Sequence, residues 1–316
     1  MKNQKIMKNQ NLFFKNIKLG ENNTPLLRLK NLEKYLRYKG EIWGKAEYMN
    51  PTGSFKDRGS VAEIQVALNR KKKGIVCAST GNMAASLAAY SARMNLKCVV
   101  VVPQNTPKRK LSQAENFGAK IIEVKGNYDQ CVNKAKKIAN DLNFLLCGDY
   151  ETRRKGQRSI GVEIAKSGIN FDAFIVPIGN GTVGSAIAEG LKKYNKNIQM
   201  IGVQGKGANP LTKAWKTKNK IITIIKEPKT AASAMKVGNP LDGKLTLSLI
   251  MESNGFLVSV SDKEMKKAQT LLAQNEGILV ELSAAATIAA LKLVLKKISK
   301  KAKIVLILTG SGLKEF

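Results

Sequence analysis

Short runs of β-branched and other apolar residues alternate with longer alanine-rich or amphipathic segments along most of this chain. The apolar runs have the length of strands and the segments between them have helical spacing, a pattern typical of βαβ units around a parallel sheet. The 316 residues are about twice the length of a typical domain. We therefore expect an α/β protein with one large or two medium domains.

The alternation falls into two blocks. The first predicts strands over 74–78, 96–103, 119–124 and 144–147, which could form one small sheet, and helices over 83–94, 108–117 and 128–142. A polar, basic connector over 149–158 and a helix near 160–166 come next. The second block predicts strands over 171–178, 199–204 and 303–308, and helices over 183–193, 262–275 and 284–298. The fold predicted is two open parallel-sheet lobes with a ligand cleft between them, a small lobe over 71–154 and a large lobe over 1–70 and 155–316.

The absence of histidine excludes whole classes of chemistry. Without histidine there is no Ser-His-Asp triad, no Cys-His pair and no His-ligated metal, so a general base has to be Lys, a carboxylate or Tyr. The four cysteines, Cys77, Cys98, Cys131 and Cys147, form no CxxC pair. We expect buried, reduced thiols and no metal site.

The net charge of +31 is a property of nucleic-acid binders, but its distribution argues against that class. The basic residues are mostly Lys and are spread along the chain, and aromatic residues are only 6%. Arg forks and stacking aromatics, which specific nucleic-acid recognition favours, are therefore scarce. No apolar run approaches the ~20 residues of a membrane helix. The basic start, 1–18, has only the cluster 12–14 as an apolar core, so we expect a cytoplasmic protein.

The segment Asn-Pro-Thr-Gly-Ser-Phe-Lys-Asp-Arg-Gly at 50–59 contains the first candidate catalytic residue. Ser54 and Asp57 match a capping box that opens a helix running through 61–68, which places Lys56 in the first helical turn. The helix dipole disfavours an ammonium group there, so Lys56 should be easier to deprotonate than a surface lysine and able to form a Schiff base. The alternative is a plain capped helix with a solvated lysine.

The segment Gly-Asn-Gly-Thr-Val-Gly at 179–184 lies between a predicted strand and a predicted helix. Backbone N–H groups at such a helix start bind phosphate, and the spacing also matches the dinucleotide motif GxGxxG. A dinucleotide site needs an acidic residue after the next strand, and that strand ends in Gln204-Gly205. A simple phosphate is therefore favoured over a dinucleotide. A tight turn without ligand is the alternative.

Two further turns follow predicted strands. Ser-Thr-Gly-Asn at 79–82 precedes a helix and would suit a carboxylate, although Asn82 could be an ordinary N-cap. Leu-Thr-Gly-Ser-Gly at 308–312 follows the last strand, at the edge where α/β sheets bind ligands. A plain loop is the alternative there.

Together these four motifs resemble threonine synthase, a pyridoxal-phosphate enzyme family with the tryptophan-synthase-β fold (fold type II). The resemblance covers roughly 23–314. Within this range, segments 230–240 and 281–285 also match the family. The chain differs from the family pattern at Met83, Cys147-Gly148 and Ser311. The resemblance implies a homodimeric lyase that converts O-phosphohomoserine and water to threonine and phosphate. Dehydration of threonine or serine, or β-replacement that makes cysteine or a sulfonate analogue, are the alternatives.

The resemblance also implies roles for individual residues. Lys56 would carry the cofactor and act as general base and acid, and Arg153 would bind the departing phosphate. The cofactor-binding residues implied are Lys56, Asn82, Gly179, Asn180, Gly181, Thr182, Val183 and Thr309. The residues implied to bind the substrate carboxylate are Ser79, Thr80 and Gly81.

Overall fold

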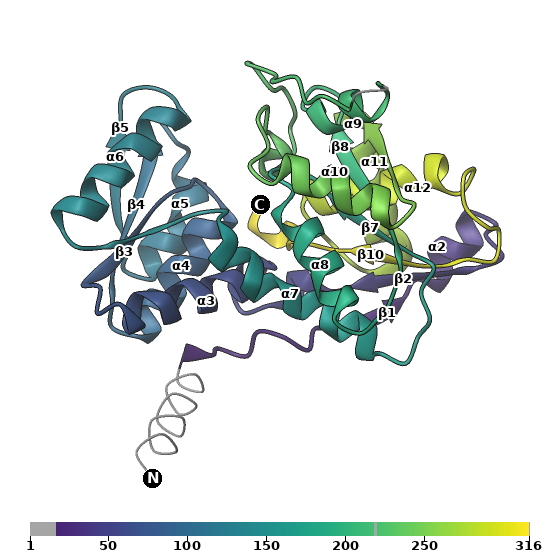
Figure 1. Ribbon diagram of the computed structural model, residues 1–316, viewed down its shortest axis with the longest axis horizontal. Coiled ribbons are helices and arrows are strands. Elements are labelled where there is room, and N and C mark those ends of the chain that lie inside the picture. Colours follow the sequence, from purple (N-terminus) through teal and green to yellow (C-terminus); the bar gives the residue numbers. More distant parts are fainter. Residues whose placement is uncertain (1–16, 218–219, 316) are drawn as a thin grey trace, which may run out of the picture. The chain divides into compact units, whose positions relative to one another are not determined.

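The computed structural model describes residues 17–217 and 220–315, so the apolar cluster at 12–14 lies outside the described residues. Packing divides the chain into two units, each an α/β structure (Figure 1). Unit 1 consists of Met1–Asn22 and Asn50–Gly156, and unit 2 consists of Asn23–Met49 and Gln157–Phe316. The prediction of an α/β chain with two parallel-sheet regions is confirmed.

Unit 1 contains a four-stranded sheet in the order β5-β4-β3-β6, with every pair parallel. Its strands are β3 (Gly74–Ala78), β4 (Lys97–Pro103), β5 (Lys120–Val124) and β6 (Leu145–Cys147). These four strands are the ones that the sequence predicted. Cys77 of β3 lies opposite Cys147 of β6 in the parallel register, so the two strands end at the same edge of the sheet.

The helices of unit 1 cover both faces of this sheet. They are α3 (Lys56–Asn69), α4 (Asn82–Arg93), α5 (Lys108–Asn116), α6 (Tyr128–Asp141) and the start of α7 (Glu151–Lys166), which continues into unit 2. Alternate strand residues face opposite sides: Ile75 and Cys77 pack with α3, α4 and α5, whereas Val76 and Ala78 pack with α6. Figure 1 shows α6 across the sheet from α4. Both faces are therefore buried, as all-parallel sheets require.

Unit 2 contains a six-stranded sheet in the order β1-β2-β10-β7-β8-β9. Its strands are β1 (Leu26–Arg28), β2 (Glu41–Lys45), β7 (Ala173–Pro177), β8 (Gln199–Gly205), β9 (Phe256–Val260) and β10 (Lys303–Ile307). All neighbours are parallel except β1 and β2, which are antiparallel. The sequence did not predict β1, β2 and β9, which lie outside the clear alternation of strands and helices.

The helices of unit 2 also pack on both faces of its sheet. They are α2 (Lys30–Tyr35), α8 (Thr182–Lys192), α9 (Pro210–Trp215), α10 (Gly243–Glu252), α11 (Asp262–Glu276) and α12 (Leu282–Val294). Ile175, Val203 and Ile304 share one core with α11 and α12. On the other side, Gly184 of α8 faces Val176 and Met200. No helix among the described residues is long and apolar enough to cross a membrane.

The predicted connector over 149–158 is wrong, because residues 151–158 form the first two turns of α7. Its Glu, Arg, Lys and Gln residues are good helix formers even without an apolar face. Glu151 and Lys155, four residues apart, form a 2.8 Å ion pair on this turn. High polarity alone therefore did not distinguish a polar helix from a loop.

The two units divide the chain differently from the predicted lobes. Residues 50–70 lie in unit 1, whereas the prediction grouped them with the large lobe. The cause is that α3 packs on α4, where the Ser86 hydroxyl donates a 2.7 Å hydrogen bond to Ser60 Oγ. The helix that starts at Lys56 is thus part of the smaller unit.

The cysteines have the environment that the sequence predicted. Cys77, Cys98, Cys131 and Cys147 are free and buried. Burial raises the pKa of the Cys77 and Cys147 thiols well above the usual range. These thiols are therefore poor nucleophiles, and they act as small core residues.

Candidate functional site

Lys56 is the first residue of α3, which confirms its predicted place in the first helical turn. Its side chain is 15% exposed, and Nζ donates a 2.8 Å hydrogen bond to Asp149 Oδ1 in an ion pair. The same Nζ lies 5.0 Å from the centre of the Phe55 ring. Asp149 follows β6, so a carboxylate at the carboxyl edge of the small sheet holds the amine of Lys56.

The predicted capping box of Ser54 and Asp57 is wrong. Phe55 is the N-cap of α3, and no side chain caps it. Asp57 instead accepts hydrogen bonds from Thr52 N at 2.8 Å and Thr52 Oγ1 at 2.5 Å, which closes the turn that leads into the helix. The buried Ser54 Oγ has no hydrogen-bond partner among the described residues. The hydrogen bonds between Thr52 and Asp57 thus fix the turn. The buried hydroxyl of Ser54 lies two residues before Lys56 in the sequence.

The turn Ser79-Thr80-Gly81 lies at the same edge of the small sheet. It links β3 to α4, with Gly81 as N-cap and Asn82 as the first helical residue. Ser79 Oγ accepts a 3.4 Å hydrogen bond from Gly81 N. Because β3 and β6 are parallel neighbours, this turn and Asp149 leave adjacent strand ends. Unit 1 therefore gathers a lysine and a helix start suited to an anion at one edge of its sheet.

Arg153 lies in a different setting from the one predicted. Its side chain is 0% exposed and forms a buried ion pair with Glu63. The guanidinium donates to the carbonyls of Gly148 and Lys56 at 3.3 and 3.1 Å, and to Ser60 Oγ at 3.4 Å. Burial by itself lowers the pKa of Arg153, but the nearby carboxylates, Glu63 above all, raise it. Arg153 is thus engaged with protein groups inside unit 1, and its implied contact with the departing phosphate stays a prediction.

In unit 2, the turn Gly179-Asn180-Gly181 links β7 to α8. Gly181 has φ +89°, and a Cβ there would lie 2.1 Å from Thr246 Oγ1. A Cβ on Gly179 would lie 2.4 Å from the Ala234 carbonyl oxygen. The turn therefore requires glycine at both positions, by close approach at Gly179 and by both conformation and close approach at Gly181.

The rest of the chain holds this turn in place through Asn180. The Asn180 carbonyl accepts a 2.9 Å hydrogen bond from Asp242 N, and its side-chain Oδ1 accepts a 3.4 Å bond from Leu241 N. At the start of α8, the hydroxyls of Ser185 and Thr246 are 3.1 Å apart. The start of α8 is thus a fixed backbone feature.

Two buried threonine hydroxyls lie at this edge of the large sheet without a protein partner. Thr182 opens α8 and is 4% exposed, and Thr309, which follows β10, is 2% exposed. Neither Oγ1 has a hydrogen-bond partner within 17–217 and 220–315. Because β10 and β7 are parallel neighbours, both residues follow adjacent strand ends. A buried hydroxyl left unpaired is costly, so the pair indicates a polar ligand at this edge.

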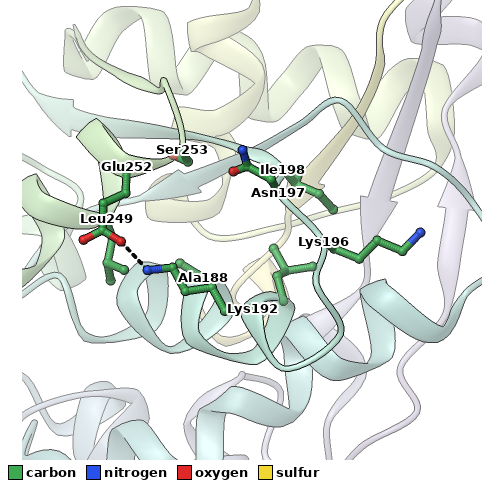
Figure 2. A pocket seen from close by; sticks show the side chains of 9 residues that line it. Ala188, Lys192, Lys196, Asn197, Ile198, Leu249, Glu252 and Ser253 are labelled. Atoms are coloured by element: carbon green, nitrogen blue, oxygen red, sulfur yellow. Dashed lines mark hydrogen bonds and ion pairs between the residues drawn. The ribbon is translucent and has the colours of Figure 1, made fainter.

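A small pocket in unit 2 lies elsewhere (Figure 2). It is lined by the last turns of α8 and α10, and the Lys192 to Glu252 ion pair crosses its rim. α8 has 11 residues, so the pocket and the glycine turn are about 15 Å apart along the helix. The pocket is therefore separate from the candidate site, because it lies at the other end of α8 and is bordered by an exposed ion pair.

Comparison with known proteins identifies the ligand class. The family model described as "Pyridoxal-phosphate dependent enzyme" matches residues 17–310. The chain belongs to this family. The phosphate-type helix start, the two unpaired threonine hydroxyls and Lys56 are the kinds of groups that pyridoxal phosphate needs, so the residues present fit this cofactor. The match also removes the dinucleotide alternative for the turn at 179–184.

Several relatives share a more specific name. The chain is 42% identical to a threonine synthase of Methanocaldococcus jannaschii, covering 95% of this chain and 76% of the relative. It is 37% identical to a threonine synthase of Halalkalibacterium halodurans, covering 94% of this chain and 84% of the relative. The resemblance to this group found in the sequence is confirmed.

Solved structures of related enzymes have the same fold. Maize serine racemase aligns with a TM-score of 0.82 at 23% identity, covering 92% of this chain and 88% of that one. Threonine deaminase isoform 2 from Solanum lycopersicum aligns with a TM-score of 0.81 at 23% identity, covering 96% and 85%. The predicted tryptophan-synthase-β-like fold class is confirmed.

Two site residues, Asp149 and Glu63, were not predicted from the sequence. Asp149 follows a strand at its carboxyl end, a position that by itself marks a candidate ligand residue. Glu63 lies in the interior of α3, and no local pattern distinguishes it from a surface glutamate. Only the fold brings Glu63 to Arg153.

The glycine turn can be tested by a stability measurement on this pyridoxal-phosphate enzyme. We expect Gly181→Ala to lower the free energy of unfolding by about 2 to 4 kcal/mol, because it combines left-handed strain with a collision at Thr246. Gly277→Ala is the control: Gly277 has φ +67° and open space around its Cβ position, so only about 1 kcal/mol is expected. Urea unfolding measures both. Equal losses would show that Thr246 moves aside without cost.

Proposed function

We propose that this pyridoxal-phosphate enzyme converts O-phosphohomoserine and water to threonine and phosphate. The observation that carries the proposal is the 42% identity to a threonine synthase over 95% of the chain. The motif at 50–59, which distinguishes this group from related lysine-centred families, adds support. In the net reaction the Cγ–O bond to phosphate breaks and Cγ gains a hydrogen, while Cβ loses a hydrogen and gains the hydroxyl of water.

We propose that the motif residues hold the cofactor. Lys56 would bond to it covalently as a Schiff base, and Asn82 would contact its ring hydroxyl. The backbone of Gly179-Asn180-Gly181-Thr182-Val183 would bind its phosphate, and Thr309 would face its ring nitrogen. The unpaired hydroxyls of Thr182 and Thr309 support these assignments, because each lacks a partner among the described residues.

The remaining roles concern the substrate. When bound, the cofactor supplies an electron sink for the charge that develops at the substrate carbons. Lys56, as a free amine, would take the proton from Cα and return protons during the reaction as general base and acid. Ser79, Thr80 and Gly81 would bind the substrate carboxylate with their hydroxyls and the N–H groups at the start of α4. No histidine is needed for any of these roles.

Product analysis tests the proposed reaction. Purified protein supplied with pyridoxal phosphate is incubated with O-phosphohomoserine, and inorganic phosphate and threonine are both measured. We expect the two products in equal amounts. Parallel incubations with threonine, and with O-phosphoserine plus sulfide or sulfite, measure keto-acid release and β-replacement. Keto acid, cysteine or a sulfonate amino acid as the main product, without threonine formation, would overturn the proposal.

Two further proposals concern the setting of the enzyme. We propose that it works in the cytoplasm, a setting that fits the proposed synthesis of an amino acid. We also propose a homodimer, as implied by the resemblance to threonine synthase. Light scattering coupled to gel filtration tests the second proposal, which predicts twice the 34.5 kDa mass of one chain.

A further inference from the structure

The ion pair between Lys56 and Asp149 joins two residues that are 93 positions apart. Both side chains are mostly shielded, with 15% and 16% exposure, so the 2.8 Å contact is screened less than a surface pair. Asp149 Oδ1 thus binds Lys56 Nζ, the atom that the proposed function bonds to the cofactor. The motif that contains Lys56 does not contain this carboxylate.

A buried frame sets the geometry of this pair. Arg153 donates one hydrogen bond to the Lys56 carbonyl and another to the Gly148 carbonyl. Glu63, its ion-pair partner, accepts a 2.9 Å bond from Gly148 N. The backbone of Lys56 and the backbone next to Asp149 are therefore fixed to the same pair of buried charges.

The frame depends on a close approach of α3 and α7. A Cβ on Gly59 would lie 2.5 Å from Arg153 Cγ, so glycine at this position lets the arginine lie flat against α3. A Cβ on Gly156 would lie 2.3 Å from the Arg58 carbonyl oxygen. Glycine at this position therefore lets the backbone of α7 approach α3 closely. Both helices are thus shaped to keep Arg153 and Glu63 together.

We propose that Asp149 is a positioning residue that receives the Lys56 amine whenever this amine is not bonded to the cofactor. The inference rests on the proposed role of Lys56. Oδ1 accepts a hydrogen bond from Nζ, which keeps the amine within the site. Asp149 thereby favours the released lysine over the attached lysine, which is the direction needed for a substrate amine to replace it.

The test measures the reactivity of Lys56 in cofactor-free protein. Reductive methylation with formaldehyde and cyanoborohydride modifies lysine amines, and mass spectrometry quantifies methylation at each lysine. At one fixed pH, we expect Asp149→Asn to raise the methylation rate of Lys56 about tenfold, because the variant loses the charge-assisted contact that holds Nζ in place. The other lysines of the same sample serve as internal standards. Asp149→Glu should restore the slow rate.

Glu151→Gln is the matched control, since it removes the same charge two residues away from an exposed ion pair with Lys155. It should leave Lys56 methylation unchanged. Circular dichroism checks that each variant is folded. An unchanged Lys56 rate in folded Asp149→Asn, or an equal rise in Glu151→Gln, would overturn the inference.

A second arm separates this inference from the proposed function. Wild-type protein is methylated with and without pyridoxal phosphate, and the cofactor should protect Lys56. Protection without an effect of Asp149→Asn would refute the inference alone. Faster methylation in Asp149→Asn without protection by the cofactor would refute the role proposed for Lys56.

Discussion

Protein with Lys56→Ala should bind no pyridoxal phosphate covalently and should release phosphate from O-phosphohomoserine at least about 10³-fold more slowly than the wild type. The substitution removes the amine proposed to bond the cofactor and to move the substrate proton, so both roles are lost together. Visible absorbance of the dialysed protein reports attachment, and a phosphate assay reports turnover. Mass spectrometry after borohydride reduction identifies the modified residue in the wild type.

Lys108→Ala is the matched control for this prediction. Lys108 is also the first residue of a helix, α5, but it is exposed. It should keep the absorbance and turnover of the wild type. Retained covalent attachment in Lys56→Ala would show that another lysine carries the cofactor, and the assignment of Lys56 would then be wrong.

The sequence predicted the small sheet well because its two central strands, β3 and β4, are mostly continuous apolar runs. Gly74–Ala78 is buried at every position, and it lies between turn residues and an alanine-rich helix. The same reasoning failed at the start of α7, which has no apolar stripe and buries the polar side chains of Arg153 and Gln157. Periodicity therefore detects elements whose buried face is apolar better than elements whose buried face is polar.

The residues of the candidate site also differ in how far the sequence predicts them. Lys56 and the glycine turn were found because their chemistry lies in consecutive residues, and the structure adds a conformational reason for Gly181. The Asp149 contact was not predictable from local sequence, because it depends on which strand ends meet at one edge of the sheet. Arg153 is the clearest case of this limit. Its sequence context is polar, yet Gly59 and Gly156 let two helices close over it.

The burial of Arg153 leads to a prediction about stability. We expect Arg153→Ala to lower the free energy of unfolding by about 3 to 5 kcal/mol, because it leaves the Glu63 carboxylate buried without its partner. Replacing both residues, as Glu63→Leu with Arg153→Met, removes the uncompensated charge and should recover most of this loss. Urea unfolding of the cofactor-free protein measures both variants.

Lys155→Ala provides the contrast, since it breaks the exposed pair with Glu151 and should cost less than about 0.5 kcal/mol. The comparison also decides between two roles for Arg153. A residue that frames Lys56 and Gly148 loses stability when it is replaced, whereas a phosphate ligand loses turnover without loss of stability. If Arg153→Ala unfolds like the wild type, keeps its cofactor and yet fails to release phosphate from O-phosphohomoserine, the buried arginine contacts the substrate after all. Glu63 would then be the residue that orients it toward the phosphate.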